Sequence, residues 1–344
     1  MDIPTKHRRA SVSALWVCLL PLWLGVASCH NGQGEGANRK GSSGKTLEML
    51  FVADRDIYTG STAKLVDSLF ASPQEGLNRI EPMFDVVNMP LTSFQNTEMF
   101  RVHRNVVLCD IKPDNPNKVY QYTDRFSSPQ AMFDIAASDR QALDSLLLRF
   151  APTIRQAFYH AEHRRIEKAF RTGITNYDIL RTLEKRFGFG LYVSNEYVLS
   201  VLEGDFAWIR KETKDYSLCL LVERQPYVNE TQFDEPVILD HLDTLLRHHV
   251  PGPADGSYAG TERRDFFYRQ TTKIDGQYAV EERGLWRCFG DFMGGPFVSY
   301  TILSPDRREL VTLFAFVYSP RKPQRDLLMQ VEGVCHSLSF VDSE

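Results

Sequence analysis

A cysteine near the N-terminus stands where covalent lipid attachment is expected. Val26-Ala27-Ser28-Cys29 closes an apolar stretch, Val12–Ala27, which follows the basic residues Lys6, Arg8 and Arg9. A basic start, a short apolar run and small residues before a cleavage point are typical of a secretory signal peptide. The cysteine directly after that point predicts a lipobox, in which the Cys29 thiol receives diacylglycerol and Cys29 becomes the acylated first residue. We therefore predict a signal peptide over residues 1–28 and a membrane anchor of palmitate-type chains on Cys29.

The same apolar stretch does not fit a membrane-spanning helix. Val12–Ala27 is shorter than the roughly 20 residues that cross the hydrocarbon core, and Pro21 interrupts it. The two or three acyl chains of a lipoprotein hold it stably at a membrane, which one chain does not.

A glycine-rich segment with aromatic neighbours is the best candidate for a binding site. Met293-Gly294-Gly295-Pro296 is expected to form a turn, because glycine adopts backbone conformations closed to other residues. A rigid loop among aromatic side chains can dock a glycan or a peptide, although aromatic residues at alternating strand positions are also typical of a core. The predicted binding residues are Trp286, Asp291, Met293, Gly294, Gly295, Pro296 and Tyr300, with Phe289, Phe292 and Phe297 nearby.

No motif in the chain predicts catalysis, a metal or a cofactor. The nucleophile elbow, the P-loop and the dinucleotide fingerprint are all absent from the sequence. His241 and His248 share a helix face, but they lack the spacing of a zinc-protease motif. Glu81, Asp85 and Asp291 are the first candidates for the carboxylate pair of a glycoside hydrolase. Structural roles are the alternative for each of them.

Composition narrows the possible partners. The formal net charge is −4, and loss of residues 1–28 lowers it to about −6. A mildly acidic chain argues against nucleic-acid binding, which requires a basic patch. After cleavage, four cysteines besides Cys29 remain. An exported protein can form disulfides, but the sequence contains no CxxC pair. Buried free thiols are therefore favoured at Cys109, Cys219, Cys288 and Cys335, and their pairing stays open.

The first half of the chain predicts a tether followed by an α/β unit. Residues 29–45 are rich in Gly, Ser and Asn and predict a flexible tether. Residues 46–173 alternate between apolar strand-like runs and helical periodicity. We expect strands over 47–53, 84–89 and 106–111, and helices over 62–70, 138–150 and 152–173. A capping box at Ser138–Gln141 is expected to open the second of these helices, and Pro152 is expected in the first turn of the third.

The second half, residues 174–344, predicts an antiparallel sheet backed by helices. Asp275-Gly276 is a strong hairpin signal, whereas residues 250–261 are expected to form a long loop. The fold class is therefore α+β, with an N-terminal α/β unit. Helices are expected over 177–187, 238–249 and 324–336, and strands over 190–193, 197–202, 206–212, 216–223, 266–274, 277–289, 297–303 and 310–318.

Several runs of the sequence are distinctive: Ser42–Lys45, Glu81–Asp85, His103–Val107, Gly290–Tyr300 and Phe316–Pro320. In these runs the chain resembles an uncharacterised lipoprotein family of the Bacteroidota, classed as a domain of unknown function. The resemblance spans nearly the whole mature chain and implies an envelope lipoprotein. That family has no assigned catalytic residues, so none carry over.

Together these features predict a lipid-anchored protein of the cell envelope. The tether contains a single acid, Glu35, which favours an outer-membrane position facing the periplasm over surface export. The favoured function is non-catalytic binding or assembly, with an envelope protein or a cell-wall component as the partner. The alternative is an envelope hydrolase that acts on peptidoglycan or another glycan. A purely structural role stays open beside the first.

Overall fold

The computed structural model describes residues 40–265 and 267–341. All of them belong to one compact unit, Ala37–Glu344. The expected signal peptide, Cys29 and most of the tether lie outside the described residues. The α+β class is confirmed by a largely parallel sheet followed by an antiparallel one. Within the described part of the chain, no helix combines the length and the apolar character that a membrane span requires.

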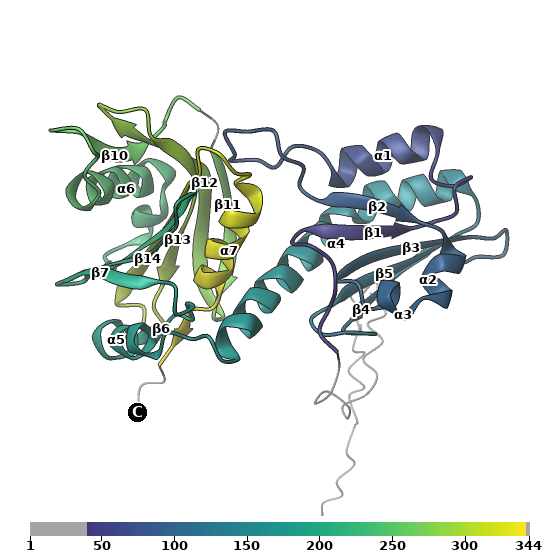
Figure 1. Ribbon diagram of the computed structural model, residues 1–344, viewed down its shortest axis with the longest axis horizontal. Helices are drawn as coiled ribbons and strands as arrows, with labels where there is room; N and C mark the ends of the chain where they lie inside the picture. Colours follow the sequence, from purple (N-terminus) through teal and green to yellow (C-terminus); the bar gives the residue numbers. More distant parts are fainter. Residues whose placement is uncertain (1–39, 266, 342–344) are drawn as a thin grey trace, which may run out of the picture. The chain divides into compact units, whose positions relative to one another are not determined.

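The first sheet has five strands in the order β2-β1-β3-β5-β4 (Figure 1). All neighbours pair in parallel except β4, which lies antiparallel at the edge. Buried parallel strands form continuous apolar runs in the sequence, and β1, β2 and β3 were expected on that ground. The mainly polar β4 was not expected, nor was β5, although β5 is apolar and buried. The strands are β1 (Glu48–Val52), β2 (Asp85–Met89), β3 (Asn105–Ile111), β4 (Lys118–Thr123) and β5 (Ala131–Ala137).

The two faces of this sheet are covered unequally. Alternate strand residues point to opposite faces. Met49, Phe51 and Phe133 pack under the long helices α1 (Gly60–Phe70) and α4 (Arg140–Arg171). Leu50 and Met132 face the short helices α2 (Leu91–Asn96) and α3 (Glu98–Arg101). Figure 1 shows the long pair on one side of the sheet and the short pair on the other.

Helix α4 is a single helix of 32 residues, so the two helices expected around Pro152 are one. Proline removes one backbone hydrogen bond and crowds the carbonyl four residues earlier. That carbonyl belongs to Leu148, whose side chain is 57% exposed, and Pro152 is exposed as well. The lost bond therefore lies on the solvent side of the helix, where carbonyl groups are accessible to water. The N-cap is Asp139, whose side chain accepts a hydrogen bond from Ala142 N, and not the expected capping box at Ser138.

The second sheet has eight antiparallel strands. Seven follow the order β10-β12-β13-β14-β9-β8-β7, and β11 also pairs with β12. Asp275 and Gly276 both have positive φ, as the predicted hairpin requires. The strands are β7 (Val198–Glu203), β8 (Phe206–Glu212), β9 (Ser217–Pro226), β10 (Tyr258–Thr261), β11 (Tyr268–Ile274), β12 (Gln277–Phe289), β13 (Gly294–Leu303) and β14 (Glu309–Tyr318).

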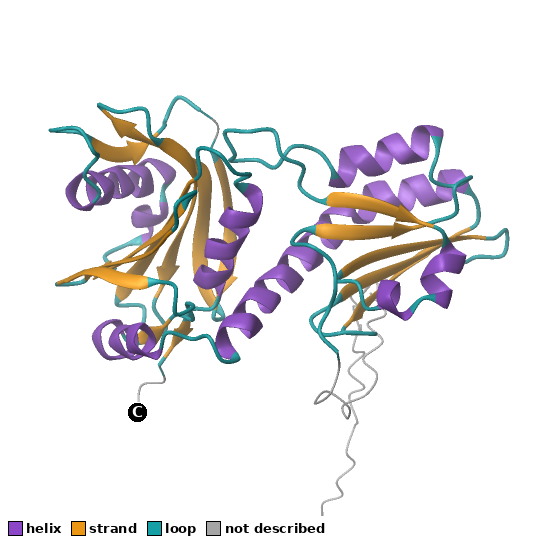
Figure 2. Cartoon of the chain, viewed as in Figure 1, coloured by secondary structure: helices purple, strands orange, loops and turns teal. Residues whose placement is uncertain are grey.

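Helices cover both faces of the second sheet (Figure 2). The end of α4, α5 (Tyr177–Phe187) and α7 (Arg325–His336) pack on one face. Helix α6 (Glu235–His249), preceded by the 3-10 turn Glu230–Phe233, packs on the other. A small ribbon joins β6 (Phe189–Gly190) to β15 (Ser339–Phe340).

Two expected boundaries differ in the structure. The loop expected over 250–261 ends in β10, which pairs with β12. The glycine- and proline-rich sequence of this segment did not indicate a strand. The strand forms because the backbone of β12 supplies its hydrogen-bond partners. Ser43, expected in the tether, forms a bridge with His103, so backbone pairing begins before residue 46. The division into domains at residues 173/174 stays a prediction.

A buried charge cluster fastens α4 and α7 to the second sheet. Both carboxylate oxygens of Glu332 on α7 accept hydrogen bonds from the guanidinium of Arg283 on β12. His163 on α4 contacts the same carboxylate, with 3.1 Å between Nε2 and Oε1, and its ring stacks on His336 at 3.9 Å. Arg283 also pairs with Glu281. Burial by itself would raise the pKa of Glu332, but Arg283 and His163 outweigh it and lower that pKa.

We expect Glu332→Gln to lower the free energy of unfolding by about 3 kcal/mol at neutral pH, because it leaves buried Arg283 undercompensated. A carboxyl whose pKa is lowered by folding stabilises the protein above its unfolded pKa, here 4.5, and this contribution is lost as pH falls through the folded value. Urea unfolding at pH 7 and pH 4 should therefore show a smaller difference between variant and wild type at pH 4.

The matched control is Glu167→Gln. Glu167 pairs with Arg171 on the exposed side of α4, and an exposed pair contributes at most about 1 kcal/mol. Equal effects of the two substitutions would contradict the assigned role of Glu332.

Candidate functional site

An indole ring crosses a neighbouring strand at the centre of the predicted binding segment. Trp286 on β12 pairs with Gly295 on β13, yet its Nε1 donates to the carbonyl oxygen of Val317 on β14, 3.0 Å away. The ring packs against Phe316, with 5.1 Å between centroids. A Cβ at Gly295 would lie 2.1 Å from the Val317 oxygen and 3.2 Å from Trp286 Nε1. The missing side chain at position 295 is therefore what lets the indole cross.

The turn expected at Met293–Pro296 lies earlier in the chain. Gly290, with φ +90°, opens the reversal, whereas Gly294, Gly295 and Pro296 lie in β13 and pair with β12. Neither glycine of that pair has a positive φ. Position 295 requires glycine because the backbone of another strand approaches it closely, and not because it needs an unusual backbone conformation.

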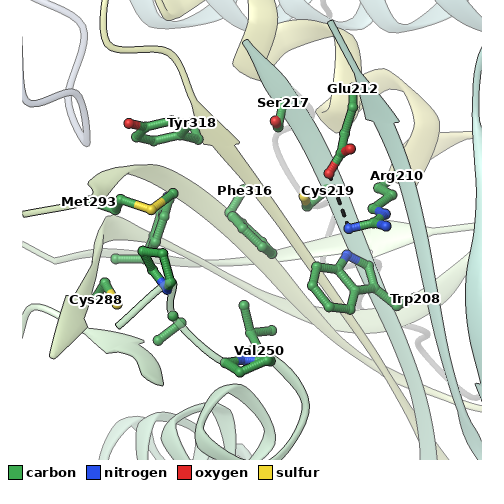
Figure 3. Close-up of a pocket in the computed structure, with 15 residues that line it drawn as sticks. Trp208, Arg210, Glu212, Ser217, Cys219, Val250, Cys288, Met293, Phe316 and Tyr318 are labelled. Carbon is green, nitrogen blue, oxygen red and sulfur yellow. Dashed lines mark ion pairs between the residues drawn. The ribbon is translucent and has the colours of Figure 1, made fainter. Parts of the chain in front are cut away.

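A cavity of about 310 Å³ opens beside Trp286, on the α6 side of the sheet (Figure 3). Strands β8, β9, β12 and β14 present alternate side chains to it, as the two-residue period of a strand requires. The segment after α6 closes one side. The lining residues are Trp208, Arg210, Glu212, Ser217, Cys219, Val250, Pro251, Gly252, Pro253, Ala259, Trp286, Cys288, Met293, Phe316 and Tyr318.

The walls of this cavity are mainly aromatic and apolar, with polar groups to one side. Figure 3 shows Arg210 and Glu212 together there, joined by an ion pair of 3.1 Å. The Arg210 guanidinium lies 5.3 Å from the ring centroid of Trp208. Apolar walls with a few convergent polar groups are typical of small-ligand sites.

One hydrogen-bond donor in the wall has only a weak acceptor. Trp208 Nε1 is buried and has no oxygen or nitrogen partner among residues 40–265 and 267–341. The neighbouring group is the Cys219 thiol, which accepts hydrogen bonds weakly. Burial raises the pKa of Cys219 to about 12, and the Trp208 N–H works against that rise. The indole N–H of Trp208 is therefore only weakly satisfied.

Cys219 in the wall is not an activated nucleophile. Cys219 and Cys288 are free and buried, as are Cys109 and Cys335, which agrees with the expectation of free thiols. A thiol with a pKa near 12 carries almost no thiolate at neutral pH, and the thiolate is the reactive form.

The structure separates the predicted binding residues, of which Gly294 and Pro296 are strand residues of β13 paired with β12. Trp286 and Met293 line the cavity, and Gly295 lies beneath the Trp286 indole. Asp291 accepts a hydrogen bond from Phe292 N within the turn. Tyr300 is fully buried in the core on the opposite face. Its hydroxyl meets His336 Nε2 at 3.2 Å. Binding by these residues stays a prediction.

Most of the residues that line the cavity were not among the binding residues expected from the sequence. Trp208, Arg210 and Glu212 alternate along β8, and Phe316 and Tyr318 alternate along β14. The alternation was visible in the sequence and indicates one shared face within each strand. It does not show that β8 and β14 lie either side of β9.

Two of the three candidate catalytic acids have structural partners. The Glu81 carboxylate accepts hydrogen bonds from Gln324 N at 2.7 Å and Arg325 N at 3.0 Å, so it caps α7. Asp85 pairs with the Arg325 guanidinium at 2.8 Å. Neither acid, nor Asp291, lines the cavity. Glu81 and Asp85 therefore have structural roles at the start of α7.

Another buried acid was not among the candidates. Glu282 on β12 is 1% exposed, and burial raises its pKa to about 7. Neither oxygen has a hydrogen-bond partner among the described residues, and Arg269 lies 3.6 Å away. Glu282 is not among the residues that line the cavity beside Trp286.

The histidines of α6 are engaged in other contacts. His241 pairs with Glu223 at 2.5 Å, and His249 stacks on Phe206 at 3.5 Å. Elsewhere in the described residues, His163, Glu332 and His336 approach one another at metal-ligand spacing. Arg283 holds both Glu332 oxygens there. A guanidinium at that position does not fit a bound cation.

Comparison with known proteins gives one family match for each half of the chain. Residues 42–171 match the Domain of unknown function (DUF8532), and residues 176–337 match the Domain of unknown function (DUF4837). Each half of the chain is therefore similar to an uncharacterised family. The prediction of an uncharacterised family is confirmed, and neither match assigns an activity or a site residue.

Other comparisons add little. No curated protein matches the chain. Among solved structures, the chain is similar to LpqN, which is involved in cell envelope biogenesis of Mycobacterium tuberculosis. The identity is 12% over 45% of this chain and 83% of LpqN, with a TM-score of 0.28. So loose a likeness carries no argument about function.

We expect Gly295→Ala to destabilise the protein by about 3 kcal/mol, within the range for overpacking a core, because the added Cβ would collide with the Val317 carbonyl. Denaturant unfolding measures the loss, and near-ultraviolet circular dichroism reports displacement of the Trp286 indole. Gly41→Ala is the matched control, since a Cβ there meets nothing within 4 Å. A wild-type Trp286 signal in Gly295→Ala would contradict the proposed crossing.

Proposed function

We propose that the protein is a lipid-anchored component of the cell envelope that binds a partner without catalysing a reaction. The bound group enters the cavity beside Trp286. The observation that carries the proposal is the cavity itself, an aromatic space of about 310 Å³. The sequence Val26-Ala27-Ser28-Cys29 supports the anchor.

The chemistry of the walls indicates what the cavity would accept. Its volume is at the lower end for small-ligand sites and suits one large side chain or one ring. Trp208, Trp286 and Phe316 offer flat apolar surfaces. We infer an aromatic or apolar group, carried by an envelope protein. Buried aromatic anchors of this kind dominate many protein interfaces.

The same walls do not favour the hydrolase. Glycoside hydrolysis needs two carboxyl groups flanking the scissile bond. Among the residues that line the cavity, Glu212 is the single acid, and it is paired with Arg210. No observation therefore favours a second function.

We expect Cys29→Ala to abolish lipid attachment, because the acylated thiol is removed. Metabolic labelling with palmitate in a Gram-negative host, followed by membrane fractionation, measures this. Cys18→Ala is the matched control: Cys18 lies within the apolar stretch and should leave labelling unchanged. Label retained in Cys29→Ala would contradict the anchor.

We expect Trp208→Ala to reduce recovery of the envelope partner about tenfold or more, the usual cost of removing an aromatic anchor. The measurement is crosslinking of tagged, anchored protein in its native envelope, followed by affinity purification and scoring of proteins and glycans. Tyr177→Ala is the control, since Tyr177 is 54% exposed and lies on α5, outside the cavity.

The outcomes of this experiment separate the alternatives. One protein recovered by wild type and Tyr177→Ala but lost from Trp208→Ala supports the proposal. Equal recovery by all three proteins would contradict a role for the cavity. Recovery of shortened glycan fragments alone would favour the hydrolase.

A further inference from the structure

A second cavity lies in the first sheet, on the face that α4 does not cover. The short helices α2 and α3 leave part of this face open, and a space of about 510 Å³ remains over β3, β4 and β5. Both the helices and these strands contribute to its lining. Its apolar wall consists of Phe94, Leu108, Tyr120, Tyr122, Phe126 and Met132.

One positive charge in this cavity has no counter-charge in contact. The guanidinium of Arg101, at the end of α3, has no hydrogen bond or ion pair to any residue in 40–265 or 267–341, and its Nε is buried. It lies 5.8 Å from the ring centroid of Phe126. A buried donor without a partner is uncommon in folded proteins and calls for an explanation.

The other charges of the cavity are paired. Arg125 contacts Asp134 at 2.7 Å, and Lys112 contacts Asp110 at 2.9 Å. Arg101 therefore leaves the lining with a net charge of about +1, which favours an anion. Arginine is well suited to binding a carboxylate or a phosphate through two parallel hydrogen bonds.

A second orphan atom lies in the same lining. Asp134 Oδ2 accepts from Arg125, whereas Oδ1 is buried and has no partner. Burial raises the pKa of Asp134. The unpaired Arg101 guanidinium marks the point at which a bound anion would complete hydrogen bonds, whereas Asp134 Oδ1 is an acceptor that an anion does not satisfy.

We propose that this cavity binds an anionic amphiphile, whose acidic group pairs with Arg101 and whose apolar body lies against Tyr120, Phe126 and the sheet. The acidic group is a carboxylate or a phosphate, as in a fatty acid or a phosphorylated lipid fragment. This site is independent of the cavity beside Trp286, because no residue lines both.

The test is isothermal titration of the full-length mature protein with three ligands of equal chain length: decanoate, decyl phosphate and decanol. We expect both anions to bind saturably and decanol to bind about tenfold more weakly, as loss of a charge-assisted hydrogen bond implies. The tighter of the two anions identifies the source of the acidic group.

The variant is Arg101→Met, which keeps the length of the side chain beside Phe126 and removes the charge. We expect it to bind both anions about tenfold more weakly and to bind decanol with the affinity of wild type. Arg149→Met is the matched control: Arg149 is exposed on α4 and lies 5.4 Å from the centroid of Phe150, outside the cavity. It should bind like wild type.

Two further variants keep the proposal falsifiable. Tyr120→Ala, at a side chain 38% exposed, should weaken the binding of all three ligands, because it removes wall surface and no charge. This variant tests the site if Arg101→Met does not fold. Trp208→Ala should leave anion binding unchanged, which separates this site from the proposed partner site. Absence of saturable anion binding, or anion affinity in Arg101→Met equal to wild type, would overturn the proposal.

Discussion

The arrangement of the chain depends on one buried carboxylate. Glu332 on α7 receives Arg283 from the second sheet and His163 from α4, the helix that also covers the first sheet. Breaking a buried charge pair is costly because the remaining charge stays without solvent. Glu81 and Asp85, which lie just before and at the start of β2, hold the other end of α7 through backbone and guanidinium groups of residues 324 and 325. Helix α7 is thus fixed from both sheets, and the second sheet is fixed with it.

The shape of the cavity beside Trp286 depends on a steric requirement at one position and not on an ion pair. Three neighbouring strands can be bridged by one indole only where the middle strand carries no side chain, and Gly295 meets that condition. The bridge holds Trp286 against Phe316 and so shapes one wall. Opposite it, Trp208 and the ion pair of Arg210 and Glu212 supply a polar edge. The result is a rigid, mainly aromatic space, which suits recognition more than catalysis.

The two cavities differ in what they can bind. The one in the second sheet is lined by aromatic groups and an internally balanced ion pair, whereas the one in the first sheet has an uncompensated guanidinium. A protein held at a membrane through Cys29 would meet both proteins and lipid-derived anions there. The two proposals therefore describe one envelope protein with separate sites for a macromolecule and for an amphiphile. Each can fail without the other.

The sequence by itself determined the α+β class, most strands and helices and the Asp275-Gly276 hairpin, because apolar periodicity and turn chemistry are local properties. It also pointed to Trp286 and Met293, which line the cavity. Only the tertiary structure decided that α4 continues through Pro152, since that depends on which side of the helix faces solvent. Only the tertiary structure showed that Glu81 and Asp85 contact the start of α7, which lies about 240 residues later in the chain. The walls of both cavities likewise combine residues from strands whose neighbours are set by sheet order, and distances along a sequence do not reveal sheet order.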